Sequence, residues 1–580
     1  MDFTLVTAFL SAVITLVLAG VYYLCSLLRY IRSAKSTGLP YIVVPCLETE
    51  TFSQLVTPLL RKAYMMQLGD GKGWPRWCRF MIKDWSWEDK RRAHDEYGEM
   101  FLVVSWQGII CYCADAATCW DVMNRRNDFT KPRDKYKILE PYGPNVATAE
   151  GSTYRFHVRM TAPTFSDLTG VNNLVWKETT RQTGLLVENW TKAAPRHLDE
   201  DINALTLAVI SLAGFGKKLE SVHEQAQDIP PGYKISFLTA LRHTTSYMLA
   251  ILLFPTWLLD LTPYAEASLA KRQLDTYLRQ IIRQERSSGG KDTESELGTR
   301  GNLLQSVVHA FQEDEEQPKQ AGHQARKRAF SEDEVMGNLF IYLLGGYETT
   351  ANSIQYGLLA LAMLPEVQSK VIEEIDHVYE EAAADGRQEL TYRDDFEKLE
   401  YTYGFMYETF RLYPGVTLIT KVCEKPQPIQ VHDERTGMTR TLTLPPGCRV
   451  YLSAPGVHYN PRYWEEPEEL RPERWTTQRF SHGGEDESKS KKVGAADRTR
   501  QMRGTLLTFS DGARACLGRK FAQAEYMAFL AALLRRFRVT LAAGVDASKA
   551  KADLDNKSAG KITLAPLDGF RLELRQRIKT

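Results

Sequence analysis

The sequence lacks a charge imbalance, and this absence restricts the partners that it predicts. Its 580 residues carry 73 Lys and Arg against 72 Asp and Glu, for a formal net charge of +1. A nucleic-acid-binding protein usually carries a basic stripe or patch. The composition therefore gives no support for a nucleic-acid partner. Hydrophobic residues at 43% and charged residues at 25% are typical of a globular protein with a large core.

Paired cysteine motifs and internal repeats are also missing. Nine cysteines are scattered along the chain, none in the CxxC spacing of a zinc site. An odd number does not close into a disulfide framework, so we interpret most of them as reduced, buried thiols. Cys516 alone lies in a sequence context that indicates chemistry.

A long run without charge opens the chain. The 26 residues of Phe3–Leu28 are rich in Leu, Val, Ala and Ile, and Arg29, Arg32 and Lys35 follow them. As a helix this run would be about 39 Å long, enough to cross a bilayer with some tilt. The positive-inside rule then places the body in the cytosol, as for a single-pass protein of the endoplasmic reticulum. A cleaved signal peptide is the alternative, but basic residues would then precede the run.

The rest of the chain predicts one large, mainly helical domain with small β-sheets. A capping box at Ser331–Glu334 predicts the start of a long helix that ends near Leu364, before Pro365. Short strands are predicted at residues 101–106, 108–113, 441–444 and 449–452. Loops are predicted at residues 285–301, 312–329 and 481–503. The predicted organisation is an anchor over 1–30, a linker and start of the body over 31–60, and the domain over 61–580.

A second apolar stretch, Tyr247–Tyr264, is only 18 residues long and contains Pro255 and Asp260. We interpret it as a pair of core helices. A second membrane span and a helix lying in the membrane surface are the alternatives.

The segment around Cys516 combines features that suit a reactive thiolate. A helical run follows the cysteine, and a helix N-terminus favours the ionised thiol. Gly512 permits a tight turn, and Gly518 removes bulk where the helix must approach something flat. Arg514 suits a carboxylate, and Phe509 could shield the sulfur from water. These features alone leave a ligand role and an ordinary buried cysteine about equally supported.

The segment Phe509–Gly518 matches the pattern Phe-x-x-Gly-x-Arg-x-Cys-x-Gly, and here the chain resembles the cytochrome P-450 haem-thiolate enzymes. Other motifs of that family follow the expected order along roughly residues 40 to 575. They are Gly345-Gly-Tyr-Glu-Thr-Thr350, Glu408-x-x-Arg411 and Pro472-Glu-Arg-Trp475. The resemblance implies the cytochrome P-450 fold and a haem b whose iron takes Cys516 as axial ligand. It also implies that Arg514 binds a haem propionate, with Phe509, Gly512 and Gly518 around the haem.

Two motifs are given different roles by this resemblance. Glu348 and Thr349 are expected to relay protons to iron-bound oxygen as an acid and a hydroxyl. Their neighbours Gly345 and Gly346 would leave room for dioxygen, whereas close helix packing is the alternative for the pair. A second group is expected to form a buried structural ion network that does not touch substrate, namely Glu408, Arg411 and Arg474.

The resemblance also implies further cations that bind the haem propionates, and several residues are candidates for them. Lys421 lies where the family usually has a basic residue. In the segment that resembles the third haem-binding helix, the usual Arg is Val158. His157 or Arg159 could substitute, although each lies about 100° around the helix from that position.

The resemblance implies a monooxygenase that inserts one oxygen atom from dioxygen into a lipophilic organic molecule, as fungal members do in specialised metabolism. No dinucleotide-binding loop is present in the sequence. The resemblance implies that electrons come from NADPH through a separate membrane-bound NADPH–cytochrome reductase. Arg519, Lys520 and Arg535 are candidates for its docking. A reductase-independent isomerase or dehydratase is the alternative, and the Glu348–Thr349 pair argues against it. A non-catalytic haem protein or scaffold is a third possibility. The substrate contacts are expected at residues 127–150, 235–265, 340–346 and 416–420.

Overall fold

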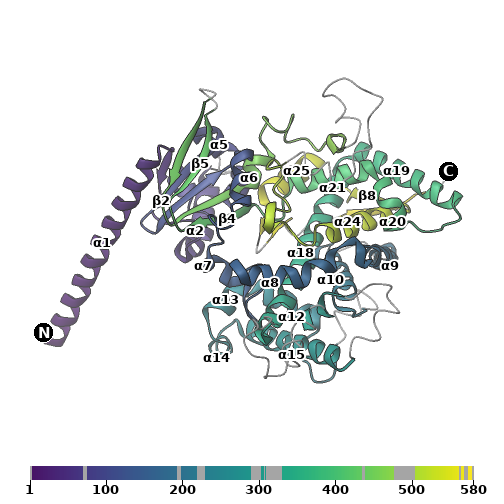
Figure 1. Ribbon diagram of the computed structural model, residues 1–580, viewed down its shortest axis with the longest axis horizontal. Coiled ribbons are helices and arrows are strands. Elements are labelled where there is room, and N and C mark those ends of the chain that lie inside the picture. Colours follow the sequence, from purple (N-terminus) through teal and green to yellow (C-terminus); the bar gives the residue numbers. More distant parts are fainter. Residues whose placement is uncertain are drawn as a thin grey trace, which may run out of the picture. The chain divides into compact units, whose positions relative to one another are not determined.

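The computed structural model describes residues 3–68, 75–192, 198–218, 229–288, 302–305, 307–308, 330–433, 438–475, 503–560, 563–566 and 572–577. Most of these residues are helical, and the sheets are small (Figure 1). Backbone contacts divide the chain into two compact units. Unit 1 comprises residues 1–132, 416–468 and 502–515, and unit 2 comprises residues 133–415, 469–501 and 516–580.

Unit 1 is built on a five-stranded sheet in the order β1-β2-β3-β7-β4. Strands β2 and β3 form an antiparallel hairpin, while β1 and β7 add in parallel. The four predicted strands are confirmed to within three residues at each end. Apolar side chains on both faces of this sheet are buried, which is why its strands read as nearly continuous hydrophobic runs. The strands of this sheet are β1 (Tyr41–Val43), β2 (Met100–Ser105), β3 (Gly108–Cys113), β4 (Leu418–Cys423) and β7 (Cys448–Ser453). Strands β5 (Gln427–Asp433) and β6 (Met438–Leu444) form a separate antiparallel pair.

The N-terminal helix α1 (Phe3–Thr37) carries the predicted apolar run and continues beyond it. In the described part of the chain it is the one helix long and apolar enough to cross a membrane. Almost none of its apolar window is buried, so the protein itself does not cover these side chains. Its C-terminal end is different, because Ala34 is buried in the core beside the sheet. The remaining helices of unit 1 are α2 (Thr51–Leu68), α3 (Arg76–Arg79), α4 (Trp85–Asp89), α5 (Arg92–Tyr97), α6 (Ala116–Asn124), α22 (Ala454–His458) and the 3-10 helix η8 (Gly512–Arg514).

Unit 2 is organised around helix α18 (Glu332–Met363), which is buried along most of its length. The predicted capping box is present, since the hydroxyl of Ser331 accepts from the Glu334 N–H and the Glu334 carboxylate accepts in return. The helix ends one residue before the predicted Leu364. Helices packed against it include α10, α21 and α24.

The other helices of unit 2 are α7 (Arg133–Tyr136), α8 (Gly151–Thr161), α9 (Val171–Lys192), α10 (Leu198–Phe215), α12 (Phe237–Ser246), α13 (Met248–Leu253), α14 (Thr256–Leu259), α15 (Ala265–Ser288), α19 (Pro365–Ala384), α20 (Tyr392–Asp395), α21 (Glu400–Leu412), α24 (Arg519–Leu534) and α25 (Ala547–Lys557). Its 3-10 helices are η1 (Lys137–Leu139), η2 (Ala162–Phe165), η3 (Asp167–Thr169), η4 (Phe396–Lys398) and η5 (Pro472–Trp475). Its described strands form two antiparallel pairs, β8 (Phe537–Leu541) with β11 (Leu572–Gln576) and β9 (Ala559–Gly560) with β10 (Leu564–Ala565).

The second apolar stretch forms the two short helices α13 and α14, of six and four residues. Both are too short to cross a bilayer. Ile251 and Leu259 are buried against Ala267 of α15, as core helices require. Other apolar side chains of the stretch are exposed, namely Leu249, Leu252, Leu253, Phe254, Trp257, Leu261 and Tyr264. The predicted pair of core helices is therefore confirmed on the inner side, while the outer side presents exposed apolar side chains. Of the predicted loops, 285–288 belongs to α15, residue 503 lies in a turn, and the rest lie outside the described residues.

A close backbone approach holds the loop before α8 against α18. A Cβ atom added at Gly337 would lie 2.5 Å from the carbonyl oxygen of Pro144 and would also meet that of Gly143. Gly143 itself has φ of +131° and faces the backbone of Asp333. Backbone atoms cannot move aside as a flexible side chain can, so both positions require glycine.

We expect Gly337→Ala to lower the thermal unfolding midpoint, because the added methyl group overpacks a backbone contact at a cost of about 1–3 kcal/mol. Gly345→Ala is the matched control in the same helix, since a Cβ atom there meets nothing within 4 Å. Alanine favours a helix over glycine by about 1 kcal/mol, so the control should be as stable as the parent or more so. Equal stability losses in the two variants would contradict the packing argument.

Candidate functional site

Cys516 lies between η8 and helix α24, two residues before the helix N-cap Gly518. Its thiol forms no disulfide and has solvent-accessible surface, unlike most of the other cysteines. Protein atoms nevertheless surround it closely enough for desolvation to raise the pKa of the thiol, while the Gly518 N–H and Arg519 act in the opposite direction. The sulfur is thus both reachable and shielded, as an axial ligand must be.

The residues before Cys516 are held by a strained turn. Ser510 has φ of +55° and Gly512 has φ of +65°. A Cβ atom at Gly512 would also lie 2.9 Å from Oδ1 of Asn124, so glycine is needed for both space and conformation. Phe509 and Arg514 are half-buried. A Cβ atom at Gly518 would meet only the Phe165 ring, at an ordinary distance of 3.8 Å.

The two glycines in the middle of α18 have different surroundings. A Cβ atom at Gly346 would lie 2.8 Å from Cγ1 of Ile210 in α10, so this glycine permits close helix packing. Gly345 is exposed and faces open space. Close helix packing therefore explains Gly346, while the open space beside Gly345 is compatible with the room for dioxygen that is expected there. Beside this open space, the Thr349 hydroxyl donates to the Gly345 carbonyl oxygen at 2.8 Å.

Glu348 is half-buried, and one of its partners was not foreseen from the sequence. Its Oε1 accepts a hydrogen bond from the hydroxyl of Thr563, at 2.9 Å. Thr563 is buried in the C-terminal segment next to β10. No sequence motif contains this threonine, and 215 residues separate it from Glu348.

The predicted network of Glu408, Arg411 and Arg474 is assembled in unit 2. Nε and Nη2 of Arg411 each donate to the Glu408 carboxylate at 2.8 Å, and Nε of Arg474 lies 3.3 Å from it. The Arg471 backbone N–H and the Trp475 indole N–H also donate, at 2.9 and 3.0 Å. The sequence did not predict these last two donors. The carboxylate is fully buried and holds η5 against α21.

The remaining propionate candidates have different environments. His157 is fully buried, with Nε2 3.1 Å from Oε1 of Glu334 and Nδ1 within hydrogen-bonding distance of Asn338. Both ring nitrogens thus face α18, which does not support a role at a propionate. Arg159 is exposed, with its guanidinium 5.8 Å from the Phe156 ring centroid. Lys421 is a buried residue of β4 in unit 1.

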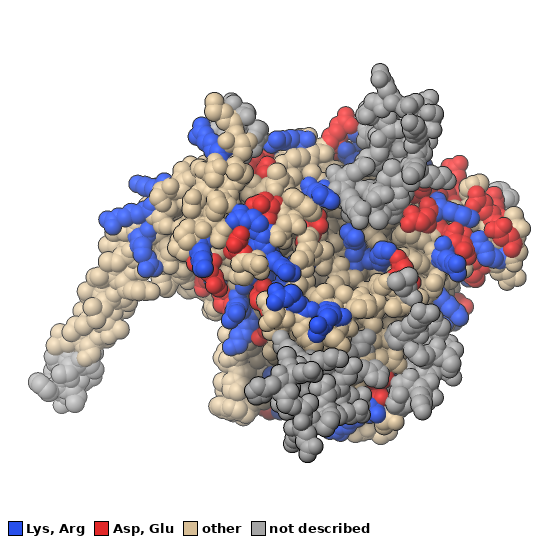
Figure 2. All heavy atoms as spheres, in the orientation of Figure 1, with Lys and Arg blue, Asp and Glu red and all other residues tan. Residues whose placement is uncertain are grey.

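Two of the three candidate docking cations are engaged within the chain. Lys520 forms an ion pair with Asp167, and Arg535 lies over the Tyr379 ring and donates to the Gln388 carbonyl oxygen. Figure 2 shows acidic and basic side chains intermixed among the described residues of the visible surface. The described residues of this face therefore single out no docking patch.

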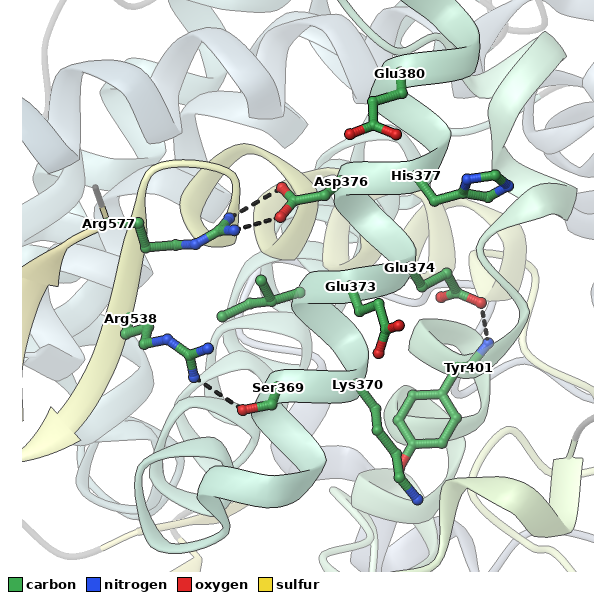
Figure 3. Close-up of a pocket in the computed structure, with 11 residues that line it drawn as sticks. Ser369, Lys370, Glu373, Glu374, Asp376, His377, Glu380, Tyr401, Arg538 and Arg577 are labelled. Atoms are coloured by element: carbon green, nitrogen blue, oxygen red, sulfur yellow. Dashed lines mark hydrogen bonds and ion pairs between the residues drawn. The ribbon is translucent and has the colours of Figure 1, made fainter. Parts of the chain in front are cut away.

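A polar pocket of about 780 Å³ lies beside α19 and contains none of the predicted site residues. Several of its polar groups have partners within the pocket (Figure 3). Arg577 binds Asp376, Arg538 donates to Ser369, and the Glu374 carboxylate accepts from the Tyr401 backbone N–H. We interpret this pocket as a structural surface feature, because a lipophilic substrate needs an apolar lining.

Comparisons with known proteins agree with the sequence motifs. A family model described as "Cytochrome P450" matches residues 74–560. The chain is 52% identical over 569 residues to cytochrome P450 monooxygenase prx9 of Penicillium rubens, covering 97% of this chain and 96% of the relative. Identity and coverage are the same for cytochrome P450 monooxygenase ORF6 of Penicillium roqueforti. Among solved structures, the haem domain of cytochrome P450DA is similar with a TM-score of 0.66 and 18% identity, covering 93% of this chain and 98% of that one.

We expect Glu408→Gln to destabilise the protein by about 3–5 kcal/mol, because it leaves the buried charge of Arg411 without its counter-charge. Glu473→Gln is the matched control in η5, since Glu473 pairs with Lys370 in a half-exposed position. An exposed pair contributes about 1 kcal/mol or less. Thermal unfolding and haem retention would be measured, and a Glu408→Gln variant as stable as the control would contradict the network's structural role.

Proposed function

This chain belongs to the cytochrome P450 family, and on that premise we propose that it inserts one oxygen atom from dioxygen into a lipophilic organic substrate, with electrons from NADPH through a separate reductase. The observation that carries the proposal is the centre of α18. There an acid and a hydroxyl, Glu348 and Thr349, lie on the helix beside the open space at Gly345.

The residues present fit a haem. Cys516 offers a sulfur that is accessible, free of disulfide and next to a helix N-terminus. We propose it as the axial ligand, with Arg514 and Lys421 as cations for the propionates and Phe509 beside the sulfur. When bound, haem with a thiolate ligand supplies the chemistry of dioxygen activation, because the thiolate pushes electron density toward the iron.

The protein's own contribution is to hold and move protons. Glu348 can exchange protons, whereas the Thr349 hydroxyl can both donate and accept a hydrogen bond. Thr349 donates to the carbonyl of Gly345, one turn earlier, so its oxygen keeps lone pairs that can accept a hydrogen bond from a bound water or substrate. We propose that these two side chains deliver protons at this point of α18.

Membrane attachment is proposed from exposed apolar side chains. The apolar window of helix α1 is almost entirely exposed, and helix α2 of the same unit exposes Phe52, Leu55 and Leu59 along one face. Their spacing of three and four residues is that of a helix lying in a membrane surface. In unit 2, the outer face of α13 and α14 has the same character. We propose a single-pass protein of the endoplasmic reticulum whose body faces the cytosol.

The class of substrate is also a proposal. One relative, 24% identical over 557 residues, is named as a monooxygenase of the phomenoic acid biosynthesis cluster of Leptosphaeria maculans. Together with the apolar residues of the expected contact regions, this supports a role in tailoring a lipophilic secondary metabolite.

The proposal is tested with membranes that contain this chain and a NADPH–cytochrome reductase. We expect NADPH oxidation that needs both proteins and dioxygen, that carbon monoxide inhibits, and that survives a carbonate wash because α1 stays in the bilayer. Haem-loaded protein that oxidises no NADPH beside a reductase active on cytochrome c would contradict the monooxygenase assignment and favour an isomerase or dehydratase. Activity that leaves the membranes with the wash would instead contradict the anchor.

A further inference from the structure

Thr563 connects two residues that lie one turn apart on α18. Its hydroxyl oxygen is 2.9 Å from Oε1 of Glu348 and 2.9 Å from Nδ2 of Asn352. A threonine hydroxyl has one proton to donate. The amide nitrogen of Asn352 can only donate, so the hydroxyl must accept there and give its own proton to the Glu348 carboxylate.

The same direction continues further along the helix. Nε2 of Gln355 donates to Oδ1 of Asn352 at 3.5 Å, and both amides are buried. The hydrogen bonds therefore run from Gln355 to Asn352 to Thr563 and end on Glu348. Hydrogen bonds arranged head to tail polarise and strengthen one another. The bond from the Thr563 hydroxyl to the Glu348 carboxylate is therefore strengthened by the two amides before it.

The backbone around Thr563 is independently anchored. The N–H of the next residue, Leu564, donates to the Gly415 carbonyl oxygen at 2.8 Å. Leu564 and Ala565 also pair with β9, opposite Gly560 and Ala559. Thr563 is 5% exposed, so neither its backbone nor its side chain is a freely moving surface group.

We propose that Thr563, supported by Asn352, is a positioning residue that sets the rotamer of Glu348 for proton delivery. This inference rests on the proposed function of Glu348. A glutamate side chain has three rotatable bonds, and a proton donor that is displaced by about 1 Å can lose as much as a hundredfold in rate. A donor attached to the C-terminal segment restricts that movement from outside the helix. The C-terminal segment then takes part in oxygen chemistry through a residue that belongs to no motif of the sequence.

The test needs no knowledge of the substrate. Without substrate, electrons from NADPH reduce dioxygen either to hydrogen peroxide, with two electrons and two protons, or to water, with four of each. The experiment uses the full chain with reductase in membranes. The ratio of NADPH to dioxygen consumed, with peroxide measured directly, gives the partition of dioxygen between hydrogen peroxide and water. Poorer proton delivery shifts the partition toward peroxide.

We expect Thr563→Val to lower the water-to-peroxide ratio about tenfold, a partial loss within the range for a misplaced acid. Thr563→Ser keeps the hydroxyl and should restore the ratio. Thr540→Val is the matched control, a half-buried threonine of β8 whose hydroxyl donates to the Glu573 carbonyl oxygen. Thr563→Ala replaces the valine variant if that variant does not load haem.

Two comparisons separate the inference from the function on which it rests. If Glu348→Gln leaves the partition unchanged, the proposed role of Glu348 is wrong. If Glu348→Gln changes it and Thr563→Val does not, only the inference is wrong. If Thr563 acts through Glu348, adding Thr563→Val to Glu348→Gln should have no further effect, and an additive effect would overturn the proposal.

An infrared measurement on the purified proteins provides a second readout that does not depend on turnover. The carboxyl band lost in Glu348→Gln identifies Glu348. That band should shift in Thr563→Val and return in Thr563→Ser, because its frequency reports the hydrogen bond. An unchanged band in Thr563→Val would overturn the proposal whatever the partition shows.

Discussion

The Glu408 carboxylate carries a negative charge in a place that water does not reach. At least five donors surround it, from both α21 and the segment at η5. An isolated charge in such a position would cost several kcal/mol, so all these partners must be present together. The ion network therefore determines where the backbone at residues 471–475 lies against α21. This makes it a support of unit 2 rather than a site for substrate.

Helix α18 combines two tasks that place opposite demands on its surface. Gly337 and Gly346 allow the loop at Gly143 and helix α10 to approach closely, so the helix is fixed in position. Gly345 instead leaves space beside the helix, next to Glu348 and Thr349. A rigid helix with one open place is suited to present an acid and a hydroxyl at a defined point.

Features that depend on short sequence intervals were predictable. The capping box requires residues three apart, and strands β2 and β3 are short, nearly continuous apolar runs beside a short turn, so these elements could be read directly. The Glu408 network was found only because a family resemblance connected Arg474 to a helix 66 residues away. Thr563 shows the limit of such reasoning, because one threonine in a C-terminal segment carries no signal of its partner. His157 shows a second limit. The sequence has Val158 where the family usually has an arginine, but this difference did not reveal that Glu334 and Asn338 face the His157 ring.

The central claim is that Cys516 supplies the thiolate ligand of a haem, and the reduced carbon monoxide difference spectrum tests it most directly. Membranes with the parent chain should show the red-shifted Soret band of a thiolate-ligated haem, and Cys516→Ser should lose it. Cys25→Ser is the matched control, because Cys25 is also exposed but lies in α1. A Cys516→Ser protein that binds haem and keeps the red-shifted band would contradict the account.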